Sequence, residues 1–294
     1  MSSILVNASA ITALQSLRMT QSSLNTTQKE ISTGLKISSA ADNASTWSIA
    51  EAMKSDKGAL STISDSLAGA QSVLNVATAA VKSAISVMND IKDAVVQAQQ
   101  PGADQAKILT SLKQLGEQLK SVVSSATFTG LNLTDGTQTS PLKFIASYNN
   151  GSGAAASVVG TIDLTVRDLT NAGAGILDNA QAAGSGAATD FTALVAGDLA
   201  VATIADTLSN ADKAIADLTT YAAEIGATST RVKQQNEFIK TMNEALTTGV
   251  SSLVDADMNE ASTRLQALQT QQQLGVQSLS IANQNAQIIL KLFQ

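Results

Sequence analysis

The acidic run Asp255-Ala-Asp257-Met-Asn259 is the part of the sequence that most resembles a set of metal ligands. Its spacing matches the first three positions of a calcium-binding EF-hand loop, where carboxylate and amide oxygens hold the ion. The loop then requires Gly, but the sequence has Glu260, and its twelfth position holds Gln266 instead of Glu. We interpret the run as acidic residues at a helix start, stabilised by the helix dipole, and expect no metal site.

The residue sets of common catalytic sites are missing from the sequence. It contains no Cys and no His, which excludes disulfides, Cys nucleophiles, thiolate metal sites and an imidazole base. The glycine pairs at 173–175 and 184–186 lack the third Gly and the strand–helix context of a nucleotide-binding loop. We expect neither catalysis nor a cofactor, because the glutamates that could pair for glycoside hydrolysis are scattered along predicted helices: Glu224, Glu237, Glu244 and Glu260.

Composition and charge limit the kinds of partner and of fold that the chain can have. The formal charge is −6 and the pI is about 4.7, so nucleic acids and anionic membranes are poor partners. Aromatic residues make up 3% and Pro occurs 2 times, which is typical of long helices packed through small side chains. The uncharged run 1–17 does not match a signal peptide, because its first cation, Arg18, follows the apolar stretch. We expect a chain without membrane insertion that is cytosolic or is exported without a cleavable signal.

Apolar residues at heptad spacing predict long helices that pack as in coiled coils. The first seam covers 10–35, where Gly34 interrupts it, and Asp42 can cap the helix that follows. A more complete seam over 60–95 stops at Gln100-Pro101-Gly102, and a returning helix then closes a helical hairpin.

The pattern changes in the middle of the chain. Turn residues alternate with apolar ones over 128–136, as in a β-hairpin, and Ile162-Asp-Leu-Thr-Val166 is the best alternating strand. Stretches rich in Gly, Ala and Ser flank that strand. The sequence therefore predicts a small, irregular, β-containing insertion.

Helical spacing returns over 201–250, and its phase then shifts beside Gly249, which predicts a hinge or a change of partner there. The last seam covers 254–293, and 265–290 carries no charge. We expect the terminal helices to pack together and to order when copies associate, since a buried amide without a partner costs about 1–3 kcal/mol. The predicted fold class is mostly α, a long coiled-coil-like helical hairpin or bundle built from both termini. The amides and Gly at core positions of these seams are Gln21, Gln28, Gln272 and Gly275.

Three motifs are specific in residue type and position. They are EISTGLKISSAADNA at 30–44, FTGLNL at 128–133 and LVDADMNE at 253–260. Together they resemble bacterial flagellin, the filament protein of the flagellum. At the first site the family carries a pattern close to RLSSGLRINSAKDDAAG, and this sequence has Lys36 for Arg and Ser38 for Asn.

The resemblance implies a structural subunit that self-assembles into the helical flagellar filament for swimming motility, located outside the cell. It implies partners as well: copies of itself or other flagellins, an export chaperone on the C-terminal segment, and the filament cap and hook-junction proteins. It also implies type III export of the unfolded chain. The implied domains are a terminal, channel-lining coiled coil (1–41 with 254–294), a helical core with a hairpin near 128–136 (42–136 with 200–253) and a variable outer insertion (137–199).

Two sets of site residues follow from this interpretation. In the segment read by the vertebrate innate immune receptor, the family resembles QRVRELAVQ, whereas Asp90 here reverses a positive charge and Ala94 removes a Leu anchor. We expect weak or no receptor activation from this segment, which includes Asn89, Asp90, Asp93, Ala94 and Gln97. We expect self-assembly through the terminal seams, namely Leu14, Leu17, Leu24, Ile31, Leu35, Val254, Met258, Leu265, Leu268, Leu279, Ile289 and Phe293.

Two alternatives remain open from the sequence alone. A hook–filament junction protein shares the terminal seams but would match the motif at 253–260 less well. A signalling module of the chemotaxis-receptor type is also rich in Ala, Ser and Gln heptads. It would need a membrane span and a symmetric hairpin tip, whereas the centre of this chain is Gly-rich and β-containing.

Overall fold

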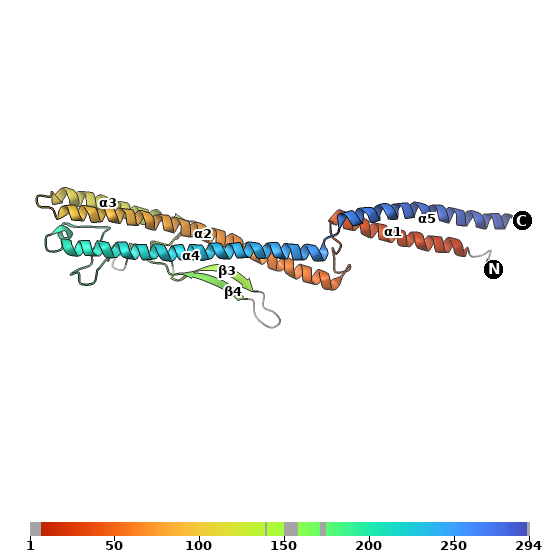
Figure 1. Ribbon diagram of the computed structural model, residues 1–294, viewed down its shortest axis with the longest axis horizontal. Coiled ribbons are helices and arrows are strands. Elements are labelled where there is room, and N and C mark those ends of the chain that lie inside the picture. Colours follow the sequence, from red (N-terminus) through yellow and green to blue (C-terminus); the bar gives the residue numbers. More distant parts are fainter. Residues whose placement is uncertain (1–6, 139, 150–157, 171–174, 293–294) are drawn as a thin grey trace. The chain divides into compact units, whose positions relative to one another are not determined.

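The computed structural model describes residues 7–138, 140–149, 158–170 and 175–292, with side chains up to Gln284. It confirms the mostly helical fold class with a small β-containing insertion (Figure 1). The elements in chain order are α1 (Ala8–Thr33), α2 (Ala44–Ala98), α3 (Gln105–Ser125), β1 (Thr127–Phe128), β2 (Leu131–Asn132), β3 (Leu142–Asn149), β4 (Val158–Leu164), the short 3-10 helix η1 (Ala196–Leu199), α4 (Ile204–Val254) and α5 (Met258–Leu292).

The chain divides into two compact units. The terminal unit contains residues 1–57 and 244–294, and the central unit contains 58–243. The predicted domain boundaries at 41/42 and 253/254 separate layers of a filament instead of compact units of the subunit. They stay predictions. No helix among the described residues is long and apolar enough to cross a bilayer.

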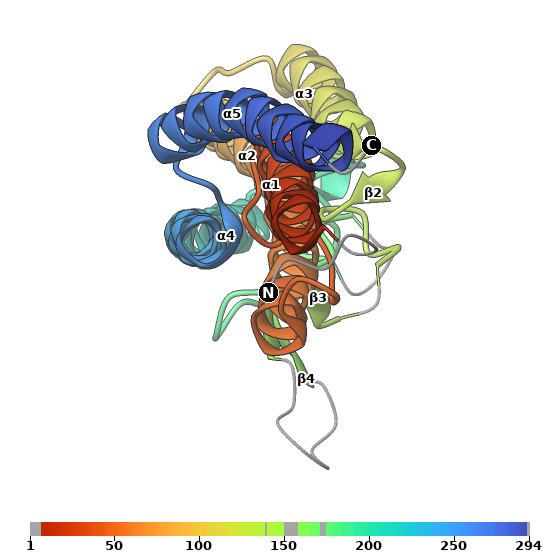
Figure 2. The same cartoon turned by 90° about the vertical axis from the view of Figure 1, so that its right-hand side faces the viewer.

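In the terminal unit, α1 and α5 run side by side, as both views show (Figures 1 and 2). Helix α1 ends where Gly34 adopts a φ of 71° and its N–H donates to the Glu30 carbonyl, which confirms the predicted interruption. Helix α5 starts after Asp257, whose side chain accepts the N–H groups of Asn259 and Glu260. The acidic run thus has the capping role expected of it.

Two predicted helix boundaries are wrong. The side chain that caps α2 is Asn43, which accepts the Thr46 N–H at 3.1 Å, whereas Asp42 bonds back to residues preceding it. Of the two alternatives predicted beside Gly249, the hinge is wrong, because α4 continues to Val254 before the chain breaks. The other alternative, a change of partner, agrees with the passage from the central to the terminal unit between 243 and 244. A Cβ on Gly249 would lie 3.1 Å from Met53 Cε, so this Gly permits close packing of α4 on α2.

The core of the central unit follows the seam of α2. Every residue of the predicted 60–95 seam is buried, and a second row, Val73, Ala80 and Val87, is also buried. Helix α2 is therefore covered on two sides. Helix α3 returns along it after the predicted stop, where Gly102 has a φ of 88°.

Within the described ranges the β-strands form two antiparallel pairs, and two isolated β-bridges lie outside them. A tight hairpin joins β1 to β2 within the region predicted to turn, and β3 pairs with β4 from Leu142↔Leu164 to Asn149↔Val158. No strand was predicted over 142–149, because the bulge at Ala146 interrupts the alternation that identifies a strand.

Helix α4 holds the insertion in place within the central unit. The Arg167 guanidinium donates two hydrogen bonds to the Glu224 carboxylate, at 3.2 and 2.8 Å. Asn210, which is fully buried, accepts the Ala182 N–H at 2.7 Å and donates to the Ala187 carbonyl at 2.8 Å. Bidentate charge-assisted bonds and buried amide bonds are the strong polar contacts of proteins.

Candidate functional site

Helices α1 and α5 meet in a single antiparallel register. Four contacts lie along the seam: Glu30 with Arg264 at 3.7 Å, Gln21 with Gln272 at 2.7 Å, Leu17 against Gly275, and Asn7 with the Ala282 carbonyl at 2.9 Å. As the residue number falls along α1, it rises along α5, so the two residue numbers of each contact add up to nearly the same value. A slip by one turn would break all four contacts together.

The amides of the seam satisfy each other. Gln272 Nε2 donates to Gln21 Oε1 at 2.7 Å, and Gln21 in turn donates to Asn25 at 3.3 Å. This pairing offsets the cost of placing amides where Leu is usual. Gln28, in contrast, is exposed, and Thr27 occupies the buried position, so the prediction for Gln28 is wrong.

Six of the twelve predicted self-assembly residues lie along the seam between α1 and α5 of the same chain. Leu24 is buried, and Leu17, Ile31, Leu265, Leu268 and Leu279 are half-buried along the seam. Leu14 and Met258 are exposed. The side chains of Ile289 and Phe293 lie outside the described residues.

Leu35 and Val254 do not belong to the helical seams and form a junction instead. Leu35 makes a β-bridge with Asp255, the Lys36 N–H donates to the Val254 carbonyl at 2.7 Å, and the Ala256 N–H donates to the Gly34 carbonyl at 2.9 Å. These bonds hold the end of α1 beside the start of α5. The seam assignment of both residues is therefore corrected.

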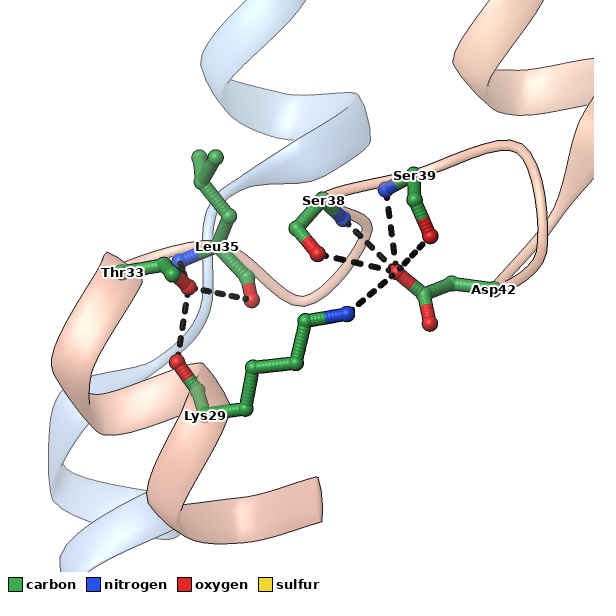
Figure 3. A network of polar contacts seen from close by, with 6 residues as sticks. All are labelled: Lys29, Thr33, Leu35, Ser38, Ser39 and Asp42. Atoms are coloured by element: carbon green, nitrogen blue, oxygen red, sulfur yellow. Dashed lines mark hydrogen bonds and ion pairs between the residues drawn. The ribbon is translucent and has the colours of Figure 1, made fainter. Parts of the chain in front are cut away.

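Asp42 orders the connection between α1 and α2 (Figure 3). Its Oδ2 accepts four hydrogen bonds, from the N–H and hydroxyl of Ser38 and of Ser39, at 3.0 to 3.1 Å, and lies 3.5 Å from Lys29 Nζ. The Ser38 N–H contributes most to lowering the pKa of Asp42 to about 2, and the two hydroxyls add to it. The carboxylate stays ionised at neutral pH.

Large apolar side chains remain exposed on the far sides of both terminal helices. Exposed fractions are 55% for Ile11 and 60% for Met19 on α1, and 57% for Leu274 and 55% for Ile281 on α5. These residues are not among the predicted ones, because one apolar seam was assigned to each helix. The available signal was the seven-residue spacing of Ala267, Leu274 and Ile281.

The segment predicted for the immune receptor lies near the end of α2. Asn89, Asp90, Asp93 and Gln97 are exposed, and Ala94 is half-buried. The structure thus presents the reversed charge of Asp90 to solvent in the subunit.

The comparisons with known proteins agree with the two halves of this architecture. Residues 4–139 match the family model of the bacterial flagellin N-terminal helical region, and residues 208–293 match that of the C-terminal helical region. Flagellin from Brucella melitensis biotype 1 is 42% identical over 295 residues, covering 100% of both chains. The chain belongs to the bacterial flagellin family.

Two further flagellins are similar to the whole chain or to part of it. Flagellin C from Rhizobium meliloti is 39% identical over 320 residues, covering 100% of both chains. A crystal structure of Bacillus cereus flagellin has a TM-score of 0.43 and 18% identity, and covers 58% of this chain and 86% of that one. This flagellin is accordingly a structural subunit that polymerises into the helical, extracellular filament of bacterial motility.

Proposed function

We propose that copies of this flagellin join through the terminal unit, in which the predicted seam residues pack α1 against α5. The observation that supports this is exposed apolar surface on both helices. Five large apolar side chains of α1 and α5 are at least half exposed, and the three on α5 lie in the charge-free stretch 265–290: Ile11, Met19, Leu274, Val276 and Ile281. Two helices can bury only one face of each other, and a helix that is apolar on more than one face needs further neighbours. In a filament those neighbours are other copies.

Deleting residues 254–294 tests this proposal. We expect the truncated chain to keep a folded central unit, because the α2 seam over 60–95 is buried there, but to form no filaments. The measurements are urea unfolding followed by circular dichroism, and electron microscopy after seeding with fragments of the full-length polymer. Filaments grown from the truncated chain alone would refute the role of the terminal unit.

The same proposal includes the partners of the subunit. The exposed apolar residues of α5 need cover before assembly, which supports binding of an export chaperone to the C-terminal segment. Export of the unfolded chain, contacts with the cap and hook-junction proteins, and mixing with other flagellins follow from the family resemblance. We also propose that the chain has no enzymatic role.

The receptor segment gives a separate expectation. We expect weak or no activation of the innate immune receptor, because Asp90 places a negative charge where the family has Arg. A reporter-cell assay should show recovery when Asp90→Arg and Ala94→Leu are combined. Lys82→Gln, an exposed change elsewhere on α2, serves as the control and should leave the weak response unchanged. Full potency of the unaltered protein would contradict the expectation.

A further inference from the structure

We propose that Met53 is an oxidation site: its conversion to the sulfoxide loosens α2 from α4 within the terminal unit. The exposed methionines Met19 and Met258 are oxidised earlier and leave this packing unchanged. The role of Met53 is separate from the proposed assembly, and its test needs no filaments.

Methionine supplies all the sulfur of this chain. The sequence has 6 Met and no Cys, and the filament works outside the cell, where the surroundings are oxidising. A peroxide converts the thioether to the sulfoxide: a bond forms between sulfur and one peroxide oxygen, the O–O bond breaks, and water leaves. Sulfur is thereby oxidised by two electrons and the peroxide is reduced. The product is polar, so it disrupts contacts that the apolar thioether makes.

The described methionines differ in how far solvent reaches them. Met19 is 60% exposed and Met258 is 43% exposed, whereas Met53 and Met242 are half-buried and Met88 is fully buried. Because the oxidant must reach the sulfur, the two exposed residues react first, the two half-buried ones later, and Met88 last.

Met53 lies on the seam of α2 where this helix belongs to the terminal unit. Going back from Leu60, the spacing of three and four residues places Lys57, Met53 and Ala50 on the same face. Ala50 is buried but small, and Lys57 carries a charge at its tip. Met53 is therefore the large apolar side chain that this part of the seam turns toward α4.

Gly249 of α4 receives the end of the Met53 side chain. A Cβ on Gly249 would lie 3.1 Å from Met53 Cε and, apart from nearby parts of α4, no other described atom lies within 4 Å of that position. The Met53 methyl group thus packs directly on α4. An oxygen on the sulfur, one bond away from this methyl group, puts a strong acceptor beside the contact, and burying it without a donor is unfavourable. We expect the sulfoxide to turn toward water, which takes the methyl group off Gly249.

Hydrogen exchange over 44–57 and 244–254 tests this role in the free subunit. The purified chain is treated with hydrogen peroxide until peptide mass spectrometry shows the sulfoxide at Met53 while Met88 is still reduced. We expect exchange in both segments to accelerate at least fivefold, while 80–95 keeps its slow exchange. A shorter treatment that oxidises only Met19 and Met258 should leave exchange in both segments within twofold.

Two variants and an enzyme separate Met53 from the other methionines. Met53→Leu keeps a similar apolar volume, so the same treatment should leave exchange within twofold. Met242→Leu removes the other half-buried thioether and should still show the fivefold acceleration. Methionine sulfoxide reductases, which return both sulfoxide epimers to the thioether, should restore slow exchange in the unaltered chain.

Four results overturn the role of Met53. Its complete oxidation leaves exchange over 44–57 and 244–254 unchanged within twofold, or it stays reduced until Met88 is oxidised. Met53→Leu shows the same acceleration as the unaltered chain, which would place the sensitive group elsewhere. Acceleration persists after the reductases have reduced Met53. This last measurement uses the unaltered chain, so it decides even where a variant folds poorly.

Discussion

A single carboxylate, that of Asp42, connects two serines that the sequence patterns alone do not link to it. Four hydrogen bonds from Ser38 and Ser39 converge on one oxygen, in a segment without helical or strand periodicity. Asp42 was predicted to cap α2 because Asp is common at the N-cap position of a helix. The neighbouring Asn43 has the same property, and only the path of the backbone decides between them.

Acidification should loosen this connection. The pKa of Asp42 is lowered from 3.8 to about 2 in the folded chain, so its stabilising effect is complete above pH 4 and is lost as the pH falls through 2. We expect hydrogen exchange at the Ser38 and Ser39 amides to accelerate below pH 4, beyond its intrinsic pH dependence. Asp42→Asn should remove this excess.

Lys29→Gln is the control for that experiment. The Lys29–Asp42 pair is exposed and 3.5 Å apart, and such pairs contribute little. The variant should therefore keep the acid-dependent exchange. Exchange that is equally slow at pH 2.5 and pH 6, after intrinsic correction, would contradict the prediction.

Gly275 should be intolerant of larger side chains because it receives Leu17. A Cβ at Gly275 would already lie 3.0 Å from Leu17 Cδ1, so Gly275→Val should destabilise the α1–α5 pair by about 1–3 kcal/mol. Loss of helical content and faster trypsin cleavage in α1 would report this. Adding Leu17→Ala should restore part of the loss, since it removes the clashing group.

Gly226→Val is the matched control for Gly275→Val. Gly226 also lies inside a helix, but nothing would lie within 4 Å of its Cβ. Val is a better helix former than Gly, so this control should be neutral or slightly stabilising. Equal losses in both variants would show that helix propensity, and not the Leu17 contact, is responsible.

Among the elements, the long helices are the most predictable. The seam of α2 could be read from the sequence because one row of Leu, Ile, Val and Ala remains in phase over five heptads, and each of its members is buried. Strand β3 could not, because its bulge and its pairing with residues 9 to 22 positions further along the chain are tertiary features. On α5 the seven-residue spacing of Ala267, Leu274 and Ile281 was also readable, but this row is shorter than the seam on the opposite side of the same helix.

Asn210 should be essential for attaching the 182–189 loop to α4. Its fully buried amide serves the Ala182 N–H, the Ala187 carbonyl and the Thr189 hydroxyl. Asn210→Ala leaves these groups without that partner, at a cost of about 1–3 kcal/mol each where they stay buried. We expect a lower urea midpoint and fast hydrogen exchange over the loop.

Ser209→Ala is the neighbouring control for Asn210→Ala. Ser209 is exposed, and its hydroxyl bonds only to the Ala205 carbonyl of its own helix. Its removal should change the free energy of unfolding by less than about 0.5 kcal/mol. A similar loss in both variants would mean that α4, and not the loop, is affected.

For the whole molecule, charge predicts how salt affects assembly. Each copy has a formal charge of −6, while the surfaces proposed to meet lack charge over 265–290. Added salt screens repulsion between copies without weakening an apolar contact, since the Debye length falls to about 10 Å at 0.1 M. We expect the critical concentration to fall as NaCl rises from 0.02 to 0.3 M.

Sodium sulfate and sucrose separate the screening of charge from the strengthening of apolar burial in that experiment. Both strengthen apolar burial, but only sulfate also screens charge. A fall in critical concentration with NaCl and a larger fall with sulfate at equal ionic strength would support the combined effect. Dissolution of filaments by salt would indicate that ion pairs hold the copies together.

The pairing of α1 with α5 determines when the terminal unit can form during protein synthesis. Gln21 and Gln272 are 251 residues apart in the chain, so α1 leaves the ribosome tens of seconds before its partner helix exists, at about 5–20 residues per second. A growing or partly delivered chain therefore cannot complete the pair that joins one copy to the next. The surface that joins copies is therefore completed last, and copies cannot polymerise before α5 has been made.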